Sequence, residues 1–143
     1  MARILGIDYG RRRVGLAVSD DADGLSFPLD VLQVRDERDA VSQVVKRCRH
    51  EAAARVVVGM PLNMDGTRGP MAEEVARFVT AIADGSGLPV ETWDERLTTW
   101  SVEEMLIEAD VSRQKRKAVR DKLAAQQILQ GWLDARGGDV PKP

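Results

Sequence analysis

Residues 3–19 read RILGIDYGRRRVGLAVS, and this stretch determines how the fold begins. It contains two short apolar runs, 3–9 and 14–19, separated only by Gly10 and three arginines, Arg11 to Arg13. Short apolar runs that are joined by a glycine-containing link of this length are typical of a β-hairpin. We therefore expect two antiparallel strands at the start of the chain.

Outward from this hairpin, the pattern indicates an α/β fold. A third strand is expected over 25–34, after the polar turn 20–24, and helical and strand patterns then alternate. Three antiparallel strands followed by βα units predict a mixed five-stranded sheet that is flanked by helices. We expect helices over about 38–53, 71–82, 102–109 and 115–135, and further strands over 55–59 and 88–93.

Length and composition predict one globular domain over residues 1–136, followed by a flexible tail over 137–143. Hydrophobic residues make up 43% of the 143 residues and charged residues 31%, which excludes wholesale disorder. No apolar run approaches the roughly 18 residues of a membrane span. The lone Cys48, on the apolar stripe of the first helix, excludes an intramolecular disulfide and favours a cytoplasmic location. With a single histidine, His50, a zinc site built on Cys and His is excluded as well.

The net charge of −2 is distributed unevenly. Basic residues gather in 11–13 and again in 113–122, where a helix is expected to begin. Cations at a helix start oppose the helix dipole, which indicates a binding role, although a solvated charged segment is the simpler alternative. The residues that we expect to bind nucleic-acid phosphates are Arg11, Arg96, Arg113, Lys115, Arg116 and Lys117.

Two acidic positions lie where predicted strands end. Asp8 ends the first strand between Gly6 and Gly10, and Asp94 and Glu95 end the fifth. Ligand sites of parallel βα units lie beyond the carboxyl ends of their strands, which favours a functional role. The alternatives are an ordinary turn aspartate at position 8 and a helix-start cluster at 94–95. The pattern also leaves open whether Asp94 or Glu95 points inward.

A third acid, Asp121, lies on the apolar stripe of the last predicted helix. It precedes Ala125, Ile128 and Trp132 by four, seven and eleven residues. An ion pair with Lys117 would be worth only about 0.2–0.5 kcal/mol and would not explain a carboxylate on this stripe. A functional role is therefore favoured here too.

Carboxylates that converge from separate elements suit hard cations such as Mg²⁺ or Mn²⁺. Two such ions can activate water and stabilise the leaving oxygen of a phosphodiester, and this chemistry requires no histidine. The residues from which we expect a metal site and catalysis are Asp8, Glu95 and Asp121.

Five blocks of the chain, in this order, resemble the YqgF/RuvX family. The likeness extends from about residue 3 to residue 134. The blocks are Ile4–Gly10, Val14–Asp20, Val58–Thr67, Asp94–Thr99, and Asp121 within Arg120–Ala125. The chain departs from the family pattern in the arginines of 11–13 and in the charged neighbours of Asp121, which affects substrate preference more than chemistry.

The resemblance implies an RNase H-like fold of the Holliday-junction-resolvase type. It also implies a cytoplasmic nuclease that processes the 5′ end of pre-16S rRNA, with junction resolution suggested for some members. The family's acidic triad falls on Asp8, Glu95 and Asp121. The expected partner is then structured or precursor rRNA, or branched DNA, bound by a monomer or a homodimer without a membrane.

Three alternatives to this function are kept open. The first is a nuclease that acts on Holliday junctions or other DNA. The second is a non-catalytic nucleic-acid-binding factor of ribosome assembly, for which the three acids would be surplus. The third is an actin-like ATPase or kinase. Such proteins generally need two domains of this kind to close around the nucleotide, whereas 143 residues supply one, and the sequence contains no P-loop motif.

Overall fold

The computed structural model describes residues 3–20, 24–97 and 112–139, with the backbone alone for 20, 116–121 and 137–139. Five strands form one mixed sheet in the order β3-β2-β1-β4-β5. Strands β1 and β3 pair antiparallel with β2, whereas β1 with β4 and β4 with β5 are parallel. The predicted sheet is confirmed. Its strands are β1 (Arg3–Asp8), β2 (Arg13–Asp20), β3 (Leu25–Gln33), β4 (Ala53–Met60) and β5 (Val90–Asp94).

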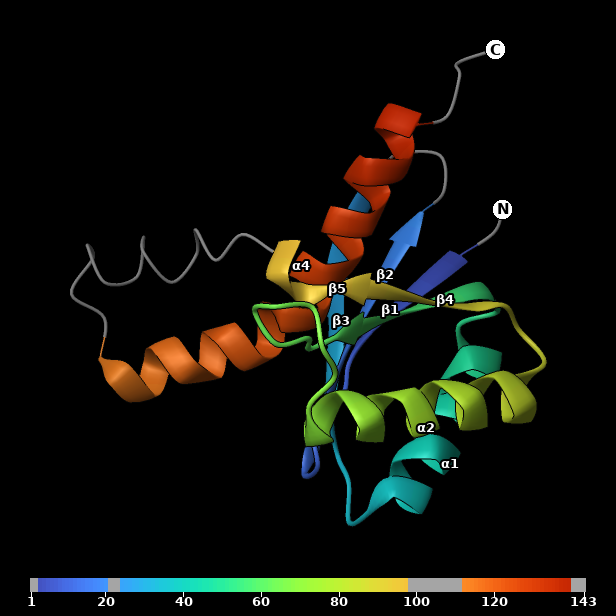
Figure 1. Ribbon diagram of the computed structural model, residues 1–143. Coiled ribbons are helices and arrows are strands. Elements are labelled where there is room, and N and C mark those ends of the chain that lie inside the picture. Colours follow the sequence, from blue (N-terminus) through green and yellow to red (C-terminus); the bar gives the residue numbers. More distant parts are fainter. Residues whose placement is uncertain (1–2, 21–23, 98–111, 140–143) are drawn as a thin grey trace.

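Helices cover both faces of the sheet (Figure 1). Helices α1 (Glu37–His50) and α2 (Pro70–Ser86) lie side by side on one face, and α4 (Arg113–Asp139) packs across the other. A single 3-10 turn, η1 (Glu95–Leu97), follows β5 directly. The helix expected over 102–109 lies outside the described residues.

Alternation along β1 divides its side chains between the two cores. Leu5 and Ile7 are fully buried with α1 and α2, whereas Ile4 packs with α4. Gly6 lies directly beneath α4, because a Cβ there would come 2.7 Å from Leu129 Cβ and 3.2 Å from the Ala125 carbonyl oxygen. By the same two-residue period, Asp8 points to the α4 face at the end of the strand.

The observed helix ends differ from the expected ones in two places. Helix α1 ends at His50 and not near residue 53, because Ala52 turns into the left-handed region at φ 52° and Ala53 starts β4. Helix α4 continues to Asp139, within the segment expected as a tail. Cys48 is buried in the core, as its place on the apolar stripe predicts. His50 is exposed, and α2 stops in glycines, with Gly87 as its left-handed C-cap.

None of the helices in the described part of the chain combines the length and the apolar character that a membrane span requires.

Candidate nuclease site

Asp8 and Glu95 lie at the same edge of the sheet. Asp8 is the last residue of β1, and Glu95 follows the last residue of β5. Strands β1, β4 and β5 run parallel, so their carboxyl ends share this edge. The negative charge of Asp8 contributes to the raised pKa of Glu95, which places the two carboxylates within electrostatic range of each other.

Glu95 lies against β4 and α4. A Cβ on Gly59 would come 3.1 Å from both Cγ and Cδ of Glu95 and 2.5 Å from Ile128 Cδ1. The missing side chain of Gly59 therefore makes the space in which Glu95 lies beneath α4. Burial, with smaller contributions from the charges of Asp8 and Asp94, raises the pKa of Glu95 to about 7. Such a carboxyl group gains from a nearby cation that compensates its charge.

Asp94 is engaged in an ion pair with Arg96. Both of its carboxylate oxygens accept hydrogen bonds from the Arg96 guanidinium at 2.6–3.0 Å. These hydrogen bonds from Arg96 hold the pKa of Asp94 below its ordinary value. Of the two acids that the sequence could not separate, Glu95 is thus the one beside Asp8.

Arg96 also joins two loops. Its Nη1 donates to the carbonyl oxygen of Met64, in the turn between β4 and α2, at 3.1 Å. In the same turn, the backbone N–H of Gly66 donates to the carbonyl of Asn63 at 2.8 Å. The Arg96 side chain therefore connects this turn to the end of β5, and its expected contact with nucleic acid stays a prediction.

Position 121 lies in α4, as expected, but its side chain is outside the described atoms. One turn later, Ala125 covers Gly6, and two turns later Ile128 contacts Gly59. Among the side chains that the structure does describe, no group of three or more His, Cys, Asp or Glu residues could hold a metal ion. The structure thus brings two of the three predicted carboxylates together, and the third stays a prediction.

A hollow of about 390 Å³ opens beside Asp8 at the β1–β2 hairpin. Arg11, Arg12 and Arg13 line it together with Asp8, Gly10, Gly15 and Val31. Three arginines thus border the space next to Asp8, an arrangement that suits an anionic ligand.

The residue beneath this hairpin was missed by the sequence reasoning. Glu74 of α2 is only 8% exposed and accepts a hydrogen bond from Arg11 Nε at 3.1 Å. A signal existed in the sequence, because Glu74 follows Met71 by three residues and precedes Phe78 by four, on the apolar stripe of its helix. The same kind of position drew attention to Asp121.

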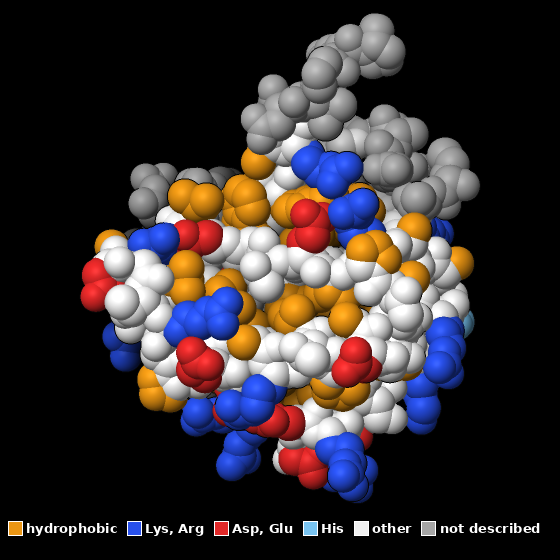
Figure 2. All heavy atoms as spheres, turned by 45° about the vertical axis from the view of Figure 1, so that its right-hand side comes forward, with side chains coloured by type: hydrophobic (Ala, Val, Ile, Leu, Met, Phe, Trp, Pro, Cys, Tyr) orange, Lys and Arg blue, Asp and Glu red, His pale blue; other side chains and the backbone are white. Residues whose placement is uncertain are grey.

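The basic residues at the start of α4 are only partly described. Arg113 and Lys115 are exposed, and the backbone N–H of Lys115 donates to Ser112 Oγ at 3.3 Å. The side chains of Arg116 and Lys117 lie outside the described atoms. On the face drawn in Figure 2, basic and acidic side chains are interspersed around exposed hydrophobic atoms.

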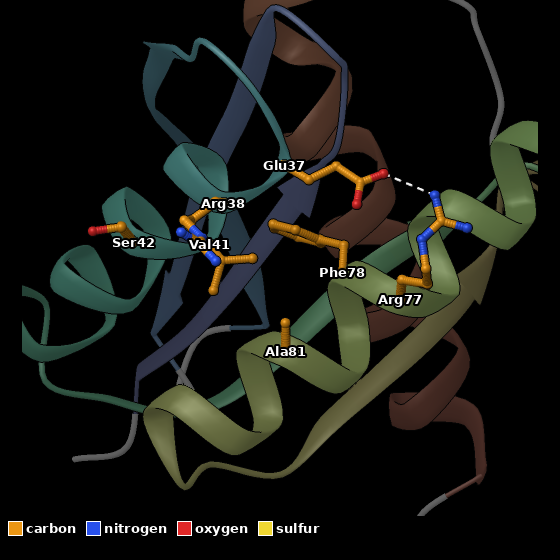
Figure 3. A pocket seen from close by; sticks show the side chains of 7 residues that line it. All are labelled: Glu37, Arg38, Val41, Ser42, Arg77, Phe78 and Ala81. Atoms are coloured by element: carbon orange, nitrogen blue, oxygen red, sulfur yellow. Dashed lines mark hydrogen bonds and ion pairs between the residues drawn. The ribbon is translucent and has the colours of Figure 1, made fainter.

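A second hollow, between α1 and α2, lies on the other face of the sheet (Figure 3). Val41 and Phe78 extend into it, and Arg77 donates a hydrogen bond to Glu37 at 2.8 Å across the two helices. It shares no lining residue with the hollow beside Asp8. We therefore do not assign it to the acidic site.

Comparisons with known proteins identify relatives of this chain. Residues 2–135 match the family model described as RuvX, Holliday junction resolvase. A protein of Symbiobacterium thermophilum is 46% identical over 98% of this chain and 97% of its own length. One of Bacillus cytotoxicus is 44% identical over 94% and 99%. Both carry the name "Putative pre-16S rRNA nuclease".

Solved structures share the fold at low identity. Thermus thermophilus RuvC, in complex with its Holliday junction substrate, matches with a TM-score of 0.55 at 18% identity, over 96% of this chain and 97% of that one. The fowlpox virus Holliday junction resolvase matches with a TM-score of 0.55 at 12% identity, over 93% and 99%. This likeness supports the expected RNase H-like fold.

Proposed function

The chain belongs to the RuvX Holliday junction resolvase family, and on this premise we propose that it is a divalent-metal-dependent nuclease that processes the 5′ end of pre-16S rRNA. The observation that carries the proposal is that Asp8, which borders an arginine-lined hollow, lies within electrostatic range of the partly buried Glu95. An enzyme with this substrate acts where ribosomal RNA matures, in the cytoplasm.

The donor set fits a hard divalent cation. A partly buried carboxyl group whose pKa is raised by burial and by a second carboxylate stores unfavourable electrostatic energy that a cation would relieve. Oxygen ligands of this type are those that Mg²⁺ and Mn²⁺ prefer. We propose that Asp8, Glu95 and Asp121 hold the metal, which, when bound, polarises the scissile phosphate and lowers the pKa of water.

The chain's own residues supply binding and orientation. The arginines of the β1–β2 hairpin border the hollow beside Asp8, where they can donate hydrogen bonds to the phosphates that flank the scissile bond. Glu95 must be deprotonated to act as a ligand, so metal binding and proton release are coupled at this carboxyl group. Arg113 and Lys115, exposed at the start of α4, offer further phosphate contacts.

The test is a cleavage panel with three substrates of matched length: a 5′ precursor fragment of 16S rRNA, an unstructured RNA and a four-way DNA junction. We expect the precursor fragment to be cut in Mg²⁺ or Mn²⁺ and left intact in EDTA. Asp8→Asn and Asp121→Asn should each lower the rate by about 100-fold or more, as removal of a catalytic group commonly does. Asp84→Asn, an exposed acid near the end of α2, is the matched control and should cut normally.

Three results would contradict the proposal. Cleavage that persists in EDTA would exclude a metal-dependent reaction. Preferential cleavage of the junction would favour the DNA alternative. Salt-sensitive RNA binding that is never followed by cleavage would favour a non-catalytic assembly factor.

A further inference from the structure

Glu74 is a buried carboxylate that the catalytic proposal does not use. It lies in the second turn of α2, and its Oε1 accepts the hydrogen bond from Arg11 Nε at 3.1 Å. Its second oxygen, Oε2, is buried and has no hydrogen-bond partner among the described residues. Burying a carboxylate is costly unless it is paired, so the contact with Arg11 is the main compensation that the structure offers.

Tyr9 joins the same contact. Its hydroxyl interacts with the Glu74 carboxylate, and burial, followed by this interaction, raises the pKa of Tyr9 well above its ordinary value. The hydroxyl therefore stays protonated. The Tyr9 ring also packs on Phe78 of α2, with ring centroids 4.6 Å apart. Helix α2 thus holds the link between β1 and β2 at Tyr9 and again at Arg11.

Arg11 stays available to a ligand while it is held. Its side chain is 67% exposed and lines the hollow beside Asp8. A guanidinium has five N–H donors, and the contact with Glu74 uses the one on Nε. The outer nitrogens can therefore still donate to a phosphate, with the guanidinium already held at one atom.

We propose that Glu74 is a positioning residue, which orients Arg11 toward a phosphate of the bound RNA. This inference rests on the proposed function for the identity of the ligand. For the affinity of the Glu74→Ala variant for RNA, positioning and net charge predict opposite changes. Removing an acid near a polyanion should strengthen binding by simple electrostatics, whereas loss of a positioning contact should weaken it.

The test compares two adjacent acids of α2. Glu74→Ala and Glu73→Ala change the net charge equally, but Glu73 is exposed. Affinity for a fluorescent 5′ precursor fragment of 16S rRNA is measured in EDTA over a series of salt concentrations. We expect Glu74→Ala to weaken binding roughly three- to tenfold, which corresponds to the loss of about one charge-assisted hydrogen bond. Glu73→Ala should leave the affinity unchanged or slightly higher.

A second set of variants separates positioning from folding. Glu74→Gln keeps an acceptor oxygen for Arg11 and Tyr9, and we expect it to retain most of the affinity. Arg11→Ala should weaken binding to a similar extent as Glu74→Ala, and the double variant should be no weaker than Arg11→Ala alone. In cleavage assays, Glu74→Ala should raise KM while kcat stays within about twofold of the wild-type value.

The inference is overturned if Glu74→Ala binds RNA as tightly as Glu73→Ala does, or if it weakens binding equally with and without Arg11. It is also overturned if the wild-type chain binds no RNA. Because binding is measured without cleavage, a chain that binds RNA but never cuts it would contradict the proposed function and leave this inference standing.

Discussion

The raised pKa of Glu95 predicts how stability depends on pH without metal. Its pKa is about 7 in the folded chain against an ordinary value of 4.5, so the folded state binds this proton more tightly. The resulting stabilisation is complete below pH 4.5 and is lost as the pH rises through 7. A difference of about 2.5 pKa units corresponds to about 3 kcal/mol at most. Glu95→Gln cannot ionise and should escape this loss.

The assay is urea unfolding in EDTA at pH 5 and at pH 8. We expect the free energy of unfolding of Glu95→Gln to exceed that of the wild-type chain by more at pH 8 than at pH 5, and the excess should grow by about 2.5 kcal/mol between the two pH values. Glu73→Gln, at an exposed position of α2, is the control and should follow the wild-type chain. Mg²⁺ at pH 8 should stabilise the wild-type chain and not Glu95→Gln.

The reasoning is refuted if the wild-type and Glu95→Gln stabilities change in parallel between pH 5 and pH 8. In that case the Glu95 carboxyl group would ionise in the folded chain as it does in the unfolded chain, and the electrostatic argument for a cation beside it would fail.

Two further substitutions test the surroundings of this carboxyl group. Gly59→Ala would place a Cβ 2.5 Å from Ile128 Cδ1 and 3.1 Å from Glu95, so we expect a loss of about 1–3 kcal/mol in urea unfolding; unchanged stability would contradict this packing. Arg96→Ala removes the hydrogen bonds that lower the pKa of Asp94, so an NMR titration should show that pKa rise toward its ordinary value; an unchanged pKa would contradict the ion pair.

The order of elements could be predicted because each strand or helix has a local signal. The apolar runs on either side of Arg11–Arg13 gave the hairpin, and the β-branched run Val56–Val58 gave a strand that is fully buried on both faces. The end of α1 could not be predicted, because Ala52 continues the helical stripe in sequence but adopts φ 52° in the structure. Tertiary contacts, and not local pattern, decide where that helix stops.

The site was predictable only in part. A carboxylate after an apolar strand identifies Asp8 and the pair 94–95, but not which member of the pair turns inward. That choice depends on Gly59, one strand away, which makes room for Glu95, and on Arg96, which engages Asp94. The Gly59 contact joins segments that are distant in sequence. The Arg96 contact is local, but it depends on the turn that η1 makes directly after β5, and the residue types at 94–96 do not specify that turn.

The most direct test of a shared metal site is the anomalous scattering of Mn²⁺ in crystals of the wild-type chain soaked at pH 8, where Glu95 is ionised. We predict a Mn²⁺ peak within coordination distance of carboxylate oxygens of Asp8, Glu95 and Asp121, which disappears in crystals of Asp8→Asn. A peak that contacts none of these residues, or an Asp121 side chain that is turned away from a metal held by the other two, would contradict the three-carboxylate site.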